Sequence, residues 1–145
     1  MTTGHCLCGK VSYRLDAGPI WIAYCHCASC RRHAGSPVTL FAGMREDRVV
    51  WTGADPDIYQ SSPGVERLFC GQCGTPVAYR AERFPGELHL YHGTLDTPAA
   101  FPPAGHVHAG GQLPWFEIDD RLPRYESAGG PEAMPVSIGP ARKAS

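Results

Sequence analysis

The sequence lacks an excess of charge of either sign. Its 145 residues include 13 lysines and arginines and 14 aspartates and glutamates, which gives a formal net charge of −1. A strongly basic surface is what attracts a protein to nucleic acid or to an anionic membrane without further specificity. We therefore expect neither nucleic acid nor a membrane among its partners.

Long hydrophobic runs are also absent. No stretch approaches the roughly 20 apolar residues that a membrane-spanning helix needs. The first residues, Met1–Cys6, have neither the basic start nor the apolar stretch of a secretory signal. We expect a protein of the reducing cytoplasm, where disulfides rarely persist and closely spaced cysteines more often bind metal or act in catalysis.

The composition favours a single, mainly β domain. Hydrophobic residues make up 43% of the chain, and 17 glycines and 14 prolines are spread without a period, which indicates short elements joined by turns. Period-two alternation or apolar runs bounded by turn residues predict strands at 10–15, 20–24, 38–42, 48–52, 65–69, 76–79, 87–91 and 106–108. One short helical turn is expected at 28–33, ended by Gly35 and Pro37.

The predicted domain covers residues 1–126. From Ser127 onward the sequence has few large apolar residues, so it cannot bury enough surface to offset the entropy lost on ordering. We interpret residues 127–145 as a low-complexity tail.

The cysteines of this chain are arranged in an unusual way. The seven cysteines form three clusters with chelating spacing: Cys6-x-Cys8, Cys25-His26-Cys27-x-x-Cys30 and Cys70-x-x-Cys73. Two residues of an extended segment that are two apart point to the same side, and a Cys-x-x-Cys-Gly turn brings its two sulfurs together. Disulfides would leave one of the seven unpaired, so metal sites are the stronger hypothesis.

Four thiolates complete a tetrahedral zinc site. Two of the clusters supply that number from distant parts of the chain, so we assign a structural zinc to Cys6, Cys8, Cys70 and Cys73. The remaining ligands, Cys25, Cys27 and Cys30, number three and leave one position vacant. An open fourth position distinguishes catalytic from structural zinc, which predicts a second, catalytic ion at this cluster.

A closed second site is the competing hypothesis. His33 follows Cys30 by three residues, and a helical turn could bring it round as a fourth ligand. His26 is a poorer candidate, since strand alternation directs it away from Cys25 and Cys27.

These segments resemble the glutathione-dependent formaldehyde-activating enzyme family, which includes centromere-protein-V-type relatives. The resemblance is carried by 4–11, 25–35, 69–76 and 106–115, together with Asp120-Arg121-Leu122-Pro123. It implies a β-tent of small antiparallel sheets stapled by zinc, with one ion on four cysteines and a second on three. The implied activity is the condensation of formaldehyde with glutathione to S-(hydroxymethyl)glutathione, or the reverse carbon–sulfur lyase reaction.

The open site suits a small thiol and an aldehyde as partners. A thiol that entered the vacant position would be deprotonated and would attack the aldehyde. A fourth thiolate would add negative charge, for which Arg31, or less favourably Arg32, is the expected counter-ion. His26 is a candidate for orienting a ligand or moving a proton. Trp115, with His106 and His108, is a candidate for lining the substrate pocket, although core packing is the simpler role for such residues.

Two other functions fit the same cysteines. A non-catalytic zinc-binding module would present its surface to a macromolecular partner, and its second site would be filled. A reductase of the methionine sulfoxide type, which has a similar fold, would need a lone reactive cysteine outside the metal sites. Here the cysteines beyond the structural four form a chelating trio, which disfavours that reductase.

Overall fold

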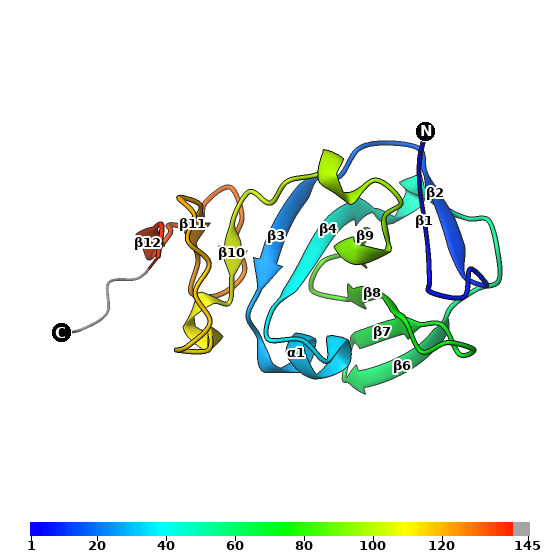
Figure 1. The fold of residues 1–145 in the computed structure, drawn as a ribbon, viewed down its shortest axis with the longest axis horizontal. Helices are drawn as coiled ribbons and strands as arrows, with labels where there is room; N and C mark the ends of the chain where they lie inside the picture. The colour runs from blue at the N-terminus through cyan, green and yellow to red at the C-terminus, as the bar shows by residue number, and fades with distance from the viewer. Residues whose placement is uncertain (141–145) are drawn as a thin grey trace. The chain divides into compact units, whose positions relative to one another are not determined.

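The computed structural model describes residues 1–140, and within them the chain forms two compact units. Unit 1 comprises Met1–Ile22 and Phe41–Pro102, and unit 2 comprises Ala23–Leu40 and the described chain from Pro103 onward. Strands predominate in both units (Figure 1), which confirms the predicted mainly β class. A domain boundary after residue 126 divides the chain differently and stays a prediction.

Unit 1 is built from two groups of antiparallel strands. The smaller sheet has the order β1-β2-β5, with bounds Thr2–His5, Ser12–Leu15 and Val49–Trp51. In the larger group the order is β4-β9-β8-β7-β6, with bounds Thr39–Arg45, Glu87–Tyr91, Pro76–Ala81, Val65–Phe69 and Asp57–Ser62. The four strands from β6 to β9 follow one another across this group (Figure 1).

The core of unit 1 follows from strand alternation. In β2 the polar and apolar residues alternate, and Tyr13 and Leu15 are buried. The Tyr13 hydroxyl lies 2.7 Å from Thr94 Oγ1. Gly4 of β1 packs directly on this ring, since a Cβ at Gly4 would stand 2.3 Å from the Tyr13 hydroxyl oxygen. Only glycine permits that approach.

A buried histidine lies in the aromatic part of unit 1. His89 of β9 is 6% exposed, and its ring centroid lies 4.6 Å from that of Trp21 and 5.3 Å from that of Tyr79. Burial lowers the pKa of His89 to about 4, although the nearby Glu87 carboxylate acts in the opposite direction. His89 is therefore neutral at pH 7.

Acid is expected to destabilise the protein through His89. Between the unfolded pKa of about 6.5 and the folded value, the unfolded chain binds more protons, so stability falls as the pH is lowered. Going from pH 7 to pH 5 should remove on the order of 2 kcal/mol from the free energy of unfolding. Urea unfolding of wild type and His89→Gln at both pH values measures this loss. If the free energy of unfolding of His89→Gln depended on pH as that of wild type does, the loss would not be due to His89.

Unit 2 contains four short strands and one helix. The strand order is β12-β11-β10-β3, with bounds Ser137–Ile138, Pro123–Arg124, His106–Val107 and Trp21–Cys25, and β3 belongs to this unit from Ala23 onward. Strand β10 is parallel to both β3 and β11, whereas β11 and β12 pair antiparallel. Strands far apart in sequence need no hairpin, and long connections permit parallel pairing. Strand β12 shows that the segment interpreted as a tail contains secondary structure, while residues 141–145 lie outside the described chain.

The helix α1, Ala28–Ala34, confirms the predicted helical turn. It ends at Gly35, which adopts φ 66°, and the N–H groups of Gly35 and Ser36 both donate to the Arg31 carbonyl. This left-handed glycine cap provides two donors for the Arg31 carbonyl in the last turn of the helix. No helix in residues 1–140 is both long and apolar enough to cross a bilayer.

Candidate metal centres

Unit 1 brings four cysteines together at one point. The Sγ atoms of Cys6, Cys8, Cys70 and Cys73 all lie within 4.8 Å of one another. Cys6 and Cys8 Sγ are 3.6 Å apart, and Cys8 and Cys70 Sγ are 3.8 Å apart. Four sulfurs at Zn–S distances of about 2.3 Å stand about 3.8 Å apart at the corners of a tetrahedron. The arrangement fits a closed four-thiolate metal site.

Each half of the four-cysteine centre is a tight turn. Strand β1 ends at His5, so Cys6 and Cys8 converge in a turn rather than on one face of a strand, which corrects the geometric reason given for their spacing. Gly9 closes this turn at φ 82°, and its N–H donates to the Cys6 carbonyl at 3.0 Å. In the other half, Gly74 has φ 79° and donates to the Cys70 carbonyl at 2.8 Å.

Hydrogen bonds from neighbouring residues support these sulfurs. The Val11 N–H donates to Cys6 Sγ and the Gln72 amide donates to Cys8 Sγ, both at 3.3 Å. Thr75 links the two turns, because its Oγ1 accepts from the Leu7 N–H at 3.0 Å and lies 3.2 Å from Cys73 Sγ. The hydrogen bond with Thr75 lowers the pKa of Cys73 to about 5. Sequence reasoning missed Thr75, which follows Cys73 by two residues.

Unit 2 brings the other three cysteines together. The Sγ atoms of Cys25, Cys27 and Cys30 lie within 4.8 Å of one another, and no fourth histidine, cysteine, aspartate or glutamate of residues 1–140 joins the group. Cys25 and Cys30 Sγ are 3.6 Å apart, again the spacing of sulfurs on one tetrahedral ion. His33 therefore lies outside the group. The three residues fit a metal site with three protein ligands.

Local structure sets the three sulfurs in place. Cys25 is the last residue of β3, Cys27 is the N-cap of α1, and Cys30 lies in its first turn. Cys27 Sγ accepts the Cys30 N–H at 3.3 Å. Hydrogen bonds from Cys25 and Cys30 lower the pKa of Cys27 to about 2, while the buried Cys25 has a raised pKa. Cys27 is also the least buried of the three cysteines.

Arg31 joins the helix to the segment after β10. Its Nη1 donates to the His26 carbonyl at 3.2 Å and to the Gly111 carbonyl at 2.6 Å. Gly111 packs closely here, since a Cβ at this position would stand 2.7 Å from the His26 carbonyl oxygen. Arg31 therefore has a definite structural contact beside the three cysteines, and its role as a counter-ion stays a prediction. Arg32 is exposed.

A buried polar chain starts at His26, between the cysteine ligands. His26 Nε2 lies 2.8 Å from His106 Nδ1, and His106 Nε2 lies 3.0 Å from Asp120 Oδ2. A carboxylate only accepts, so His106 donates from Nε2 and neutral His26 donates from its own Nε2. His26 Nδ1 then carries a lone pair and has no hydrogen-bond partner among the described residues.

Arg124 ends the polar chain. This side chain is 2% exposed, and its Nη1 donates to Asp120 Oδ1. Further donations from the guanidinium go to the carbonyls of Leu122 and Ile118, at 2.7 and 2.8 Å. Every link of the chain is therefore hydrogen-bonded, and Asp120 and Arg124 hold the ring of His106, and through it that of His26.

Asp120→Asn is expected to lower the free energy of unfolding by about 3 kcal/mol. The substitution leaves the Arg124 guanidinium buried without its counter-charge, and a broken buried ion pair typically has an effect of this size. Chemical denaturation at pH 7 measures it. Asp119→Asn is the matched control, because Asp119 directly precedes Asp120 and its carboxylate is exposed. Equal stabilities for the two variants would show that the pair contributes nothing.

The cysteine geometry agrees with a family match over most of the chain. Residues 1–110 match the family described as glutathione-dependent formaldehyde-activating enzyme. The chain belongs to this family.

Individual proteins that are similar to this chain agree with the family assignment. A protein of Halomonas elongata, provisionally named a glutathione-dependent formaldehyde-activating enzyme, is 30% identical over 128 residues, which cover 81% of each chain. An uncharacterized lyase of Schizosaccharomyces pombe is 30% identical over 76 residues, 52% of this chain and 55% of that protein. The crystal structure of a Rhodobacter sphaeroides protein superposes with a TM-score of 0.54 at 25% identity, and covers 65% of this chain and 87% of that one.

Trp115, the remaining predicted site residue, lies beyond the family match. Its side chain is 71% exposed, and its ring stands edge-on to that of Phe116 at 6.2 Å. A part in ligand binding stays a prediction for this residue.

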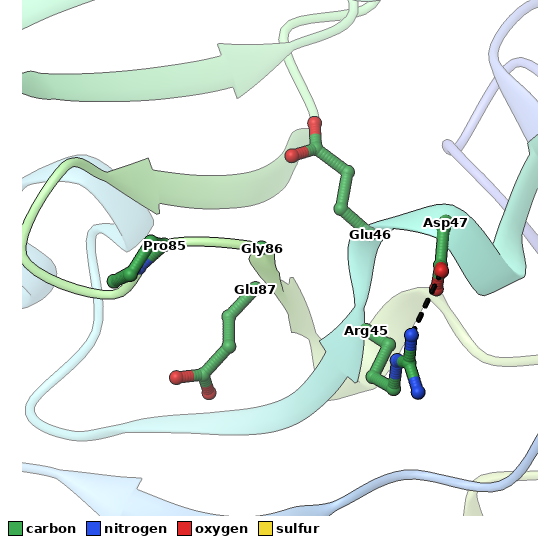
Figure 2. A pocket seen from close by; sticks show the side chains of 6 residues that line it. All are labelled: Arg45, Glu46, Asp47, Pro85, Gly86 and Glu87. Carbon is green, nitrogen blue, oxygen red and sulfur yellow. Dashed lines mark hydrogen bonds and ion pairs between the residues drawn. The ribbon is translucent and has the colours of Figure 1, made fainter.

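Unit 1 of this formaldehyde-activating family member also has a hollow of about 540 Å³ without cysteine (Figure 2). It is lined by the end of β4 and the turn before β9, at Arg45, Glu46, Asp47, Pro85, Gly86 and Glu87. Its carboxylates already have partners in the protein: Arg45 pairs with Asp47, Arg80 with Glu46, and the Trp21 indole with Glu87. The carboxylates that line the hollow are therefore paired with other side chains of the protein.

Proposed function

We propose that the protein is a zinc-dependent carbon–sulfur lyase, or thiol–aldehyde condensing enzyme, resembling S-(hydroxymethyl)glutathione synthase. The observation that carries the proposal is the group of three cysteine sulfurs, Cys25, Cys27 and Cys30, with no fourth ligand residue among residues 1–140. Family membership supports the choice of glutathione and formaldehyde as substrates. The relative named as a lyase supports the reaction class.

The proposed reaction is an addition without oxidation or reduction. The thiol loses its proton, its sulfur forms a bond to the aldehyde carbon, and the carbonyl electron pair moves to the oxygen, which takes up a proton. The reverse reaction breaks the same carbon–sulfur bond and releases the aldehyde. A zinc ion on the three cysteines would supply a position where a thiol binds as its thiolate.

The chain's own residues shape this position. Cys25 and Cys30 are buried and Cys27 is half-buried, so Cys27 is the most exposed of the three ligands. Arg31 holds the segment at Gly111 against the backbone of His26, which keeps the loop and the helix together. His26 and His106 have pKa values lowered by burial, so both rings are neutral near pH 7 and add no charge to the site.

We also propose that both cysteine centres bind zinc, and that the protein works in a reducing compartment such as the cytoplasm. Tetrahedral all-thiolate sites are typical of zinc. A reducing compartment keeps thiols available as ligands.

The proposal is tested by exchange NMR of glutathione with formaldehyde, which measures the rate of adduct formation and breakdown at equilibrium. Purified protein with two zinc ions is expected to accelerate this exchange, and Cys27→Ser is expected not to. Titration calorimetry with glutathione gives an independent measure of thiol binding. Two bound zinc ions without acceleration and without thiol binding would refute the proposal and favour a non-catalytic module that binds a macromolecule.

A further inference from the structure

His108 has a backbone conformation that sets it apart from the rest of the described chain. Its φ is 51° and its ψ is 40°, and it is the only non-glycine residue with positive φ in residues 1–140. Histidine enters this left-handed region more readily than most residues, but only glycine does so without strain. Glycines follow at positions 110 and 111, yet the strained position itself holds an imidazole.

The surrounding hydrogen bonds hold His108 in this conformation. Its N–H donates to the Ser127 carbonyl at 3.1 Å, and its carbonyl accepts from the Gly111 N–H at 3.0 Å. The next N–H along the chain, that of Ala109, donates to the Tyr125 carbonyl at 2.8 Å. Strain that is maintained in this way is concentrated at functional sites in proteins.

His108 lies beside the three-cysteine centre. Val107 of β10 is paired with Cys25 of β3, and its carbonyl accepts the His26 N–H at 3.2 Å. After the turn, a Cβ at Gly111 would stand 3.8 Å from Cys27 Cα. The residues before and after His108 therefore lie against the segment that holds Cys25 and Cys27.

The imidazole is near the ligands without being one of them. Its nitrogens are not part of the group of ligand atoms within 4.8 Å of one another. An electrostatic interaction between the His108 side chain and Cys27 places the imidazole in the neighbourhood of that ligand. The side chain is only partly buried, so a bound molecule can reach it.

We propose that His108 contacts the small molecule bound at the three-cysteine centre, donating a hydrogen bond to the oxygen of the aldehyde or of its thiol adduct. This inference rests on the proposed function. A neutral imidazole has one N–H to donate, and a donor aimed at an oxygen that gains electron density accelerates addition to a carbonyl. No proton has to leave the ring, since the oxygen takes its proton from solvent.

The backbone strain provides a test that separates the ring from its structural setting. Glycine accommodates φ 51° freely, so His108→Gly is expected to retain both zinc ions and to melt at or above the wild-type temperature. Its kcat/KM should nevertheless fall about tenfold or more. Asparagine also tolerates this conformation and carries an amide donor. The kcat/KM of His108→Asn should therefore fall less than that of His108→Gly. Ala109→Gly, which loosens the adjacent backbone and keeps the imidazole, is the control and should keep wild-type kcat/KM.

Binding of glutathione alone provides a second readout. Titration calorimetry should give the same Kd for wild type and His108→Gly, because the proposed contact is with the oxygen and not with the thiol. Four results would overturn the inference: kcat/KM of His108→Gly within about twofold of wild type, loss of zinc from that variant, weakened glutathione binding by it, or an equal loss of activity in Ala109→Gly. Wild-type protein that neither catalyses nor binds thiol would instead refute the proposed function, and His108's role with it.

Discussion

Cys70→Ser is expected to release the metal from the four-cysteine centre and to unfold unit 1. Cys70 is fully buried, and together with Cys6 it belongs to the hydrophobic core of that unit. The sulfurs of Cys8 and Cys70 meet across 62 residues of chain, so an ion bound there would link the turn after β1 to the turn after β7.

The expected effect is large because a metal bound at this centre would supply folding free energy. Binding of a structural zinc contributes on the order of 10 kcal/mol or more. Net stabilities of domains are about 5–15 kcal/mol, so losing most of that contribution is enough to unfold the unit. A serine hydroxyl is a poor zinc ligand, and it would leave a polar group in the buried position of Cys70.

Metal analysis and circular dichroism measure this outcome. The variant should contain less zinc than wild type and should lose the cooperative thermal transition of the β signal. Thr75→Val is expected to have a smaller effect than Cys70→Ser, because it keeps all four cysteines and removes only the hydroxyl that links the two turns. A Cys70→Ser protein that folds with wild-type stability would show that the centre is dispensable for folding.

Cys27→Ser is expected to reduce two bound zinc ions to one while the fold is retained. The lost ligand belongs to the three-cysteine group only, and serine is a preferred N-cap residue that can accept the Cys30 N–H as the cysteine sulfur does. Helix α1 should therefore remain. Activity on the thiol–aldehyde adduct should fall by a factor of about 100 or more, because ligands and metal of a catalytic centre act as a unit.

The matched control is Ser29→Ala, an exposed position in the same helix. It should keep two zinc ions and wild-type exchange rates in the NMR experiment. Loss of both ions from Cys27→Ser, accompanied by global unfolding, would contradict the division of the cysteines into a structural and a catalytic centre.

The strands that sequence alone predicted are those with a strong local pattern. The expected strands at 65–69 and 87–91 agree with β7 and β9, and most of the others differ from the structure by a few residues at their ends. Strand β6 was missed because all its residues are exposed, so no face of it alternates with the core. Strands β11 and β12 have two residues each, too few for any period to show.

The candidate sites divide in the same way. Spacing was enough to group all seven cysteines correctly, because chelation needs particular residue types within a few positions of one another. It could not reveal Thr75 as the link between two turns, or the hydrogen-bonded chain from His26 to Arg124, since a threonine or an aspartate in a loop carries no pattern of its own.

The amino-acid sequence by itself determined the mainly β class, the family and the division of the cysteines into four and three. These depend on local spacing and residue chemistry. Only the tertiary structure decided that β10 lies parallel to its neighbours, that Asp120 and Arg124 support the histidine beside the ligands, and that His108 adopts a strained conformation directly after the strand that pairs with Cys25. Those features join segments separated by up to about a hundred residues, and burial and hydrogen bonding fix such contacts only when the whole chain packs.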